Sequence, residues 1–297
     1  MISLLKKIKI NPLFWFVIGI GMLTGYFREV IMIFSIVLIH ELGHGIAAQH
    51  FKWRIRKIEL LPFGGVAEVE EYGNRPLKEE FIVLIAGPLQ HIWLIGLSYL
   101  MIHFSFWTQT DHQMFITHNL MILLFNLLPI WPLDGGKLMY LMLSTKLPFQ
   151  KSLVTTLKSS IVLLGFFSLI SIYLFPFHLN LWIVIVFLIY SHYFEWKQRN
   201  YAYMRFLMER YYQNHQPFAE TVPVPVLEKL TVQEVLKLFR RGVKHKVIID
   251  DGSFAPKKII PEKAVLKAFF EEEKARFMIS SLAPPICSKK LKNGIIY

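Results

Sequence analysis

The sequence predicts an α-helical polytopic membrane protein with six transmembrane helices, followed by a small C-terminal α/β domain. Hydrophobic residues make up 54% of the 297-residue chain, and its mean hydropathy is +0.42, both high for a soluble protein. Six apolar stretches come close to the roughly 20 residues that a helix needs to cross the hydrocarbon core. The basic residues gather in alternate connections between these stretches, as membrane topology requires.

The six predicted membrane helices cover residues 10–27, 30–50, 81–103, 114–131, 158–176 and 179–195. Fourteen Lys and Arg residues precede residue 197, and thirteen of them fall on one side of the membrane if all six stretches cross it. Only Arg28 falls on the other side. The positive-inside rule then places both termini in the cytoplasm. Topology accounts for much of the net charge of +12, so we expect no nucleic-acid partner.

The chain divides into a membrane domain at 1–196, a linker at 197–222, a soluble domain at 223–283 and a tail at 284–297 that we expect to be disordered. The Pro-rich joint "PFAETVPVPVLEKL" (217–230) begins in this linker. Beyond it, "TVQEVLKLFRRG", "VKHKVIID" and "PEKAVLKAFFEEE" predict a helix, a strand and a second helix. A single cysteine, Cys287, excludes an intrachain disulfide.

The segment "HELGH" at residues 40–44 places three ionisable side chains in an apolar helix. His40 and His44 are four residues apart and share one helix face, which suits two imidazole ligands of one divalent metal ion. Glu41 projects beside such a metal, where it can take a proton from water. A packed polar histidine is the ordinary alternative, but each ionisable group at membrane depth costs about 2.5–3.5 kcal/mol on insertion scales. The pattern therefore indicates zinc hydrolysis.

A catalytic zinc ion needs a third protein ligand. His50 lies six residues after His44, and a helix turns by about 100° per residue, so His50 falls nearly on the opposite face. Asp134 in "NLLPIWPLDGGK" is the better candidate, because it and Asp111 are the only carboxylates between Glu80 and Glu195. Prolines also end the preceding helix, and Gly135–Gly136 let the backbone turn. The alternative role for Asp134 is to cap a short helix, "GGKLMYLML".

These motifs resemble the site-2 protease family of intramembrane zinc metalloproteases. "HELGH" lies in a predicted membrane helix, and Asn126, Pro129, Asp134 and Gly135 match the family pattern N-x-x-P-x-x-x-x-D-G. Longer segments, "LLPFGGVAEVEEYGNRPLKEEFIVLIAGPLQHIWL" and "RFLMERYY", resemble the sporulation branch of the family. One departure stands in the third predicted helix, where many members read G-P-x-x-N and this chain ends the pattern with His91. This departure weakens any role given to that helix but leaves the metal site unaffected.

The resemblance implies a three-helix catalytic core, accessory helices and a β-hairpin that dips into the bilayer. Residues 54–71 suit this hairpin, although an ordinary cytoplasmic hairpin explains their alternation equally well. In this interpretation zinc is held by His40, His44 and Asp134, and Glu41 is the catalytic base. Contacts to substrate or oxyanion would come from four residues, Asn126, Pro132, Phe63 and Gly64.

The resemblance also implies partners. The substrate would be the membrane-associated precursor of a late sporulation sigma factor, cleaved on the mother-cell side of the membrane around the forespore, under the control of membrane inhibitor proteins. The soluble domain resembles a single cystathionine-β-synthase-type module, which binds ATP and works in pairs, so we expect a homo-oligomer. The alternative function is a non-proteolytic metal-binding or transport protein, for which the expected repeated halves are not found in the sequence.

Overall fold

The computed structural model describes residues 8–10, 12–53, 55–61, 64–69, 75–175, 177–212, 221–250 and 258–282. The chain separates into two compact units, Met1–Phe206 and Leu207–Tyr297. Phe63 and the predicted tail lie outside the described residues, as do residues 213–220 of the predicted linker.

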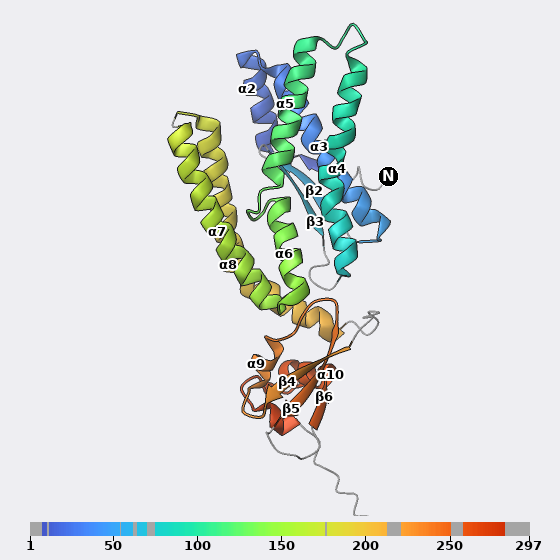
Figure 1. Cartoon of the computed structure of the whole chain (residues 1–297), viewed down its shortest axis with the longest axis vertical. Helices are drawn as coiled ribbons and strands as arrows, with labels where there is room; N and C mark the ends of the chain where they lie inside the picture. Colours follow the sequence, from blue (N-terminus) through green and yellow to red (C-terminus); the bar gives the residue numbers. More distant parts are fainter. Residues whose placement is uncertain are drawn as a thin grey trace, which may run out of the picture. The chain divides into compact units, whose positions relative to one another are not determined.

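The first unit is mostly helical, and its long helices run beside one another (Figure 1). Three helices, α3, α4 and α7, are long and apolar enough to cross a membrane. Each of the six predicted stretches overlaps one helix. The helices of this unit are α2 (Pro12–Thr24), α3 (Phe27–His50), α4 (Leu77–Met101), α5 (Gln109–Asn126), α6 (Asp134–Lys146), α7 (Phe149–Leu174) and α8 (Leu179–Tyr212).

Helix α5 begins earlier than hydropathy suggests. Thr108 accepts a hydrogen bond from the Asp111 backbone N–H, and the Asp111 carboxylate accepts one from the Thr108 backbone N–H. This reciprocal capping satisfies two donors that the first turn would otherwise leave free. The polar segment 108–113, which precedes the predicted membrane helix at 114–131, therefore forms the start of α5.

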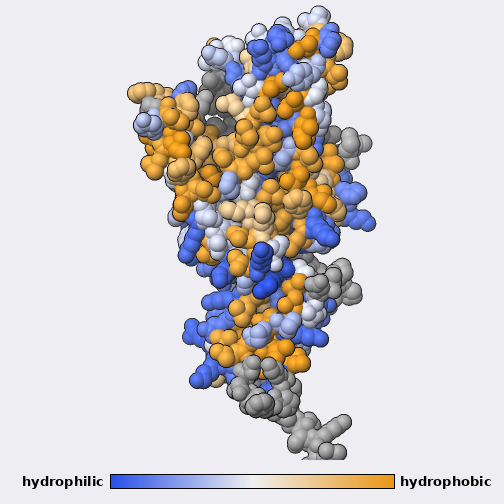
Figure 2. Space-filling view, in the orientation of Figure 1, coloured by the Kyte–Doolittle hydropathy of each residue, from blue (hydrophilic) through white to orange (hydrophobic). Residues whose placement is uncertain are grey.

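The outer surface of these helices is apolar. Side chains such as Leu100, Val162 and Leu169 are 66–70% exposed. Figure 2 shows hydrophobic side chains covering much of the helical unit on the face that is drawn. Contiguous apolar surface of this extent is unfavourable in water and suits lipid, so this is a membrane protein.

A core of helices α3, α4 and α5 positions the candidate site. Buried side chains of Met32, Ile36, Leu94 and Phe115 join the three helices in one cluster. A second cluster joins the segment before α6 to α7 and α8. The candidate ligands lie on helices that are packed on several sides and that can hold them in place.

The predicted hairpin is present as β2 (Ile55–Leu61) and β3 (Gly64–Val69), and it packs against α3 (Figure 1). Strand β1 (Ile8–Ile10) pairs in parallel with the far edge of β2, which gives the order β1-β2-β3. Among the described strands, β3 therefore has one edge without a partner. Whether the hairpin enters the bilayer stays a prediction.

The second unit is a small α/β fold. It contains β4 (Thr221–Leu227), α9 (Val232–Leu236), β5 (Lys244–Asp250), β6 (Lys258–Pro261), α10 (Glu262–Phe270) and η1 (Ile279–Leu282). Strand β4 pairs in parallel with β5, and β6 pairs with β5 in antiparallel fashion. Residues 221–227 of the predicted Pro-rich joint form β4, so this part of the prediction is wrong. An edge strand tolerates proline, since its outward N–H groups have no partner to lose.

The last turn of α8, from Leu207 onward, belongs to the second unit and takes part in a buried ion cluster there. The Arg210 guanidinium donates to the Glu262 carboxylate at 2.6 Å and to the Val243 carbonyl at 2.6 Å. His245 Nδ1 lies 3.2 Å from the same carboxylate. Burial opposes ionisation of Glu262, but the hydrogen bonds from His245 and Arg210 outweigh it and hold its pKa at about 2.

Candidate metal centre

Three side chains from two distant segments converge on one point in the first unit. His40 Nε2 lies 3.0 Å from Asp134 Oδ2, His44 Nε2 lies 2.9 Å from the same oxygen, and the two Nε2 atoms are 3.1 Å apart. All three residues are buried, with exposed fractions of 2–7%. The structure thus brings together the three residues that the sequence analysis selected as ligands.

The spacing of these donor atoms fits a zinc ion. Zinc binds imidazole nitrogen at about 2.0–2.1 Å in tetrahedral geometry, which puts neighbouring donors roughly 3.3 Å apart. The observed separations of 2.9–3.1 Å are within a few tenths of an ångström of that value. Small movements of two rings and one carboxylate would admit the ion and leave its fourth position open.

Asp134 is oriented toward the imidazoles and does not cap the helix. Helix α6 begins at Asp134, and its N-cap residue Leu133 makes no side-chain capping bond, so the capping alternative is wrong. The second carboxylate oxygen, Oδ1, lies 3.4 Å from Lys137 Nζ. A Cβ at Gly135 would lie 2.1 Å from the Leu127 carbonyl oxygen, so only glycine allows the chain to turn so tightly here.

His44 is fixed by the backbone of α4. Its Nδ1 donates to the Val83 carbonyl at 2.7 Å, which leaves the lone pair on Nε2 facing the cluster. Gly87 lies directly against the ring, because a Cβ at this position would be 2.2 Å from His44 Nε2. A Cβ at Gly43 would likewise meet the Ala86 carbonyl oxygen at 2.5 Å. Helices α3 and α4 can approach this closely only with glycine at both positions.

His40 is contacted by a chain of buried polar side chains. Its Nδ1 lies 3.0 Å from His91 Nε2, and His91 Nδ1 is hydrogen-bonded to Asn119 Oδ1. Neither His91 nor Asn119 is exposed. From sequence alone, the departure at His91 weakens any role for the helix that carries Gly87 and His91. His91 and Asn119 are polar residues in otherwise apolar helices, and this was the signal in the sequence that could have pointed to them.

The other described site residues are spread over α3, α5, β3 and the segment before α6. Glu41 is buried next to His40, and its charge acts on His44. Asn126 is the last residue of α5 and is half-buried, and Pro132 is half-buried in the segment before α6. Gly64 is the first residue of β3. His50 is exposed at the end of α3, away from the cluster, as its rotation about the helix predicts.

Comparison with known proteins identifies the family. Residues 29–114 match peptidase family M50. Over 287 residues, 96% of this chain and 98% of the relative, the sequence is 43% identical to stage IV sporulation protein FB of Bacillus subtilis (strain 168). The chain belongs to peptidase family M50. This membership confirms the site-2 protease resemblance and makes the protein an intramembrane zinc metalloprotease.

Two archaeal comparisons agree with this assignment to family M50. The chain is 34% identical to zinc metalloprotease MJ0392 of Methanocaldococcus jannaschii over 146 residues, 48% of this chain and 39% of the relative. The fold is similar to the solved site-2 protease from Methanocaldococcus jannaschii, with a TM-score of 0.52 and 28% identity over 64% of this chain and 91% of that chain. Membership of a protease family decides against the transport protein that the sequence left open.

Proposed function

We propose that this protease cleaves the membrane-associated precursor of a sporulation sigma factor and so releases the active factor. The single observation that carries the catalytic part is the convergence of His40, His44 and Asp134 within hydrogen-bond distance of one another. Sequence identity of 43% over nearly the whole length of stage IV sporulation protein FB supports a role in sporulation. The sigma-factor substrate rests on the sequence resemblance.

The proposed mechanism assigns each residue a task. A zinc ion bound by His40, His44 and Asp134 would supply Lewis acidity to an attacking water molecule and to the scissile carbonyl. Glu41 then takes one proton from the water as its oxygen bonds to the carbonyl carbon, and returns that proton to the amide nitrogen as the C–N bond breaks. The Asn126 amide can donate to the developing oxyanion from the end of α5.

Substrate binding is assigned to the hairpin and the segment before α6. A peptide bond inside a helix is hidden from the site, so the cleaved segment has to unwind before reaction. The free edge of β3 offers it backbone hydrogen bonds in the strand-addition mode. We place Phe63, Gly64 and Pro132 along this path as substrate contacts.

Replacing the proposed base separates catalysis from metal binding. The full chain is co-expressed with a candidate sigma precursor, as wild type and as Glu41→Gln, and zinc is measured in the purified proteins. We expect Glu41→Gln to keep its zinc and to lose cleavage by about 10²–10⁴-fold. Glu29→Gln is the matched control, because Glu29 lies on the same helix and pairs with His118 at 2.9 Å. Normal cleavage by Glu41→Gln would refute the assignment.

We also propose six membrane crossings with both termini on the cytoplasmic, mother-cell side. Three helices meet the length and hydropathy needed for a crossing, and the distribution of basic residues supports the orientation. Fusions of alkaline phosphatase to residue 106 and to the C-terminus test this arrangement. The first fusion should be active outside the cytoplasm and the second inactive.

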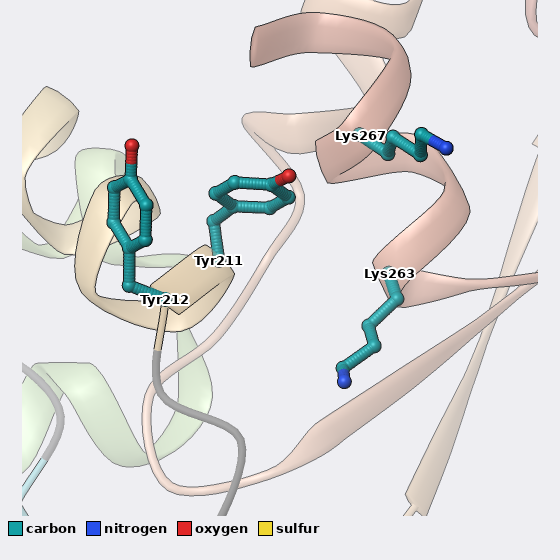
Figure 3. A pocket seen from close by; sticks show the side chains of 4 residues that line it. All are labelled: Tyr211, Tyr212, Lys263 and Lys267. Carbon is teal, nitrogen blue, oxygen red and sulfur yellow. The ribbon is translucent and has the colours of Figure 1, made fainter. Parts of the chain in front are cut away.

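The second unit is proposed to act as a cystathionine-β-synthase-type module that binds ATP. Its shallow pocket of about 350 Å³ is lined by Tyr211, Tyr212, Lys263 and Lys267, with both lysines projecting from α10 (Figure 3). Lys267 lies 3.8 Å from Glu271, so part of its charge is already balanced. Equilibrium dialysis of the full-length protein with labelled ATP tests the proposal, and Lys263→Ala should weaken any binding that uses this pocket.

Pairing of two such units supports the proposed homo-oligomer. Pro225, Ile248 and Ile259 form one row across the sheet, on the face opposite the buried residues Val247 and Ile260. An apolar row of this kind suits contact with a second copy. Ile259→Lys should shift the full-length protein in detergent toward the monomer in light scattering. Membrane inhibitor proteins of sporulation are the further partners that we propose.

A further inference from the structure

We infer that His91 and Asn119 are positioning residues that set the orientation and tautomer of His40, so that its Nε2 lone pair faces the metal. This inference deepens the proposed function and rests on it. Neither residue belongs to the ligand motifs, and they come from two different helices, α4 and α5. Both side chains are fully buried. Their hydrogen bonds form one continuous path that ends at His40.

The direction of each hydrogen bond follows from the amide at the start of the path. Asn119 Nδ2 donates to the His91 backbone carbonyl at 3.3 Å, so its oxygen is turned toward the His91 ring. An amide oxygen can only accept, and His91 Nδ1 must therefore carry the proton. A fully buried imidazole is most stable when neutral, which leaves Nε2 of His91 as an acceptor.

The same reasoning fixes His40. His91 Nε2 accepts from His40 Nδ1 at 3.0 Å, so His40 holds its proton on Nδ1 and its lone pair on Nε2. That lone pair faces the other two donors at 3.0 and 3.1 Å. Without the path, the His40 ring could flip or take the other tautomer, and its Nε2–H would then donate to Asp134 and occupy the metal position.

The two histidine ligands are oriented by different means. His44 donates to the backbone carbonyl of Val83, a partner that no substitution removes. Within the described part of the chain, the partners of His40 are side chains. Loss of a side chain that hydrogen-bonds to a metal ligand typically lowers metal affinity by about 10–100-fold. Of the two histidine ligands, His40 is therefore the one that substitutions at positions 91 and 119 can misorient.

The test measures the zinc dissociation constant of the purified full-length protein by competition with a chelator. Wild type is compared with His91→Phe, which removes both ring nitrogens, and with Asn119→Leu, which frees the His91 tautomer. His91→Gln is the conservative variant, because its amide oxygen can take the place of Nε2 and accept from His40. His112→Phe is the matched control: Ser98 and His112 form another buried hydrogen bond between α4 and α5, at 2.9 Å, outside the path to His40.

We expect His91→Phe and Asn119→Leu to bind zinc 10–100-fold more weakly, and His91→Gln to stay within about threefold of wild type. His112→Phe should bind zinc like wild type, although it loses a comparable helix contact. Equal zinc affinity in wild type and His91→Phe would overturn the inference, as would equal losses in His91→Phe and His112→Phe. If His91→Phe does not fold, the contrast between Asn119→Leu and His91→Gln decides. Wild type without stoichiometric zinc would instead refute the proposed function.

Discussion

A single added methyl group at Gly87 should disable the metal centre. A Cβ at this position would lie 2.2 Å from His44 Nε2, 2.5 Å from Cε1 and 2.8 Å from Cδ2, whereas ordinary van der Waals contact begins at 3.4 Å. The ring would have to retreat by about 1.2 Å, or α4 would have to move away from α3. Neither is easy, because His44 Nδ1 is bonded to Val83 of the same helix α4 at 2.7 Å.

The displacement is large compared with what a zinc site tolerates. Ligand distances in such sites hold to within about 0.2 Å, so a shift of more than 1 Å removes His44 as a ligand. We expect Gly87→Ala to weaken zinc binding by at least about 100-fold. That is the upper end of the loss seen when a hydrogen-bond partner of a metal ligand is removed. Cleavage of the precursor should fall with it.

The assay compares Gly87→Ala with Gly96→Ala on the same helix. No atom lies within 4 Å of a Cβ built at Gly96, so alanine there should leave zinc binding unchanged and stabilise the helix by up to about 1 kcal/mol. Zinc content after dialysis and cleavage in co-expression are the two measurements. Normal zinc content in Gly87→Ala would show that the contact between α4 and the ring does not shape the site.

Three further outcomes are expected. Asp134→Asn should lose stoichiometric zinc, measured by metal analysis, while circular dichroism shows that its helices remain. A variant that still binds one zinc ion per chain would remove Asp134 from the ligand set. Proline in place of Val66 or Glu68 should slow cleavage without changing zinc content, because proline disturbs strand β3. Normal turnover by these variants would contradict the strand-addition step. The second unit should lose on the order of 3 kcal/mol of stability on acidification. Burial keeps the pKa of His245 below 6.5 although its hydrogen bond with Glu262 raises it, and the pKa of Glu262 is held at about 2. The unfolded chain therefore binds more protons than the folded chain as pH falls from about 6.5 toward 2. Amide exchange of β5 in the full-length protein measures this loss, and a flat profile would refute it.

The convergence of the candidate ligands was predictable because two of the three residues lie on one helix. The spacing of His40 and His44 along one helix follows from 3.6 residues per turn, and the structure places both rings on the same face. Asp134 is ninety residues farther on, and its selection depended on the scarcity of carboxylates near it and on the turn-forming residues around it. The helical unit was predictable for a similar reason, since a membrane imposes a length and a composition on each helix.

The contacts that orient the ligands were not predictable from single segments. Gly87, His91 and Asn119 act on α3 from two other helices, and nothing in their local sequence says which ring they will touch. Strand β4 was missed for a different reason. Its prolines are normally signs of a joint, and only its place at the edge of the sheet makes them compatible with a strand.

Removing zinc should loosen the helices that hold the ligands and leave the second unit unchanged. With Nδ1 of both histidines donating elsewhere, two lone pairs and a carboxylate oxygen face one another at 2.9–3.1 Å, an arrangement that is repulsive unless a cation lies between them. A ligand present at a thousand times its dissociation constant stabilises the folded state by about 4 kcal/mol. Chelation in detergent should therefore speed amide exchange in α3 near His40 and His44 while β5 exchanges as before, and added zinc should reverse the change. If amide exchange in α3 is unaltered, the fold itself holds the three side chains in place without a metal. Their convergence then has another cause.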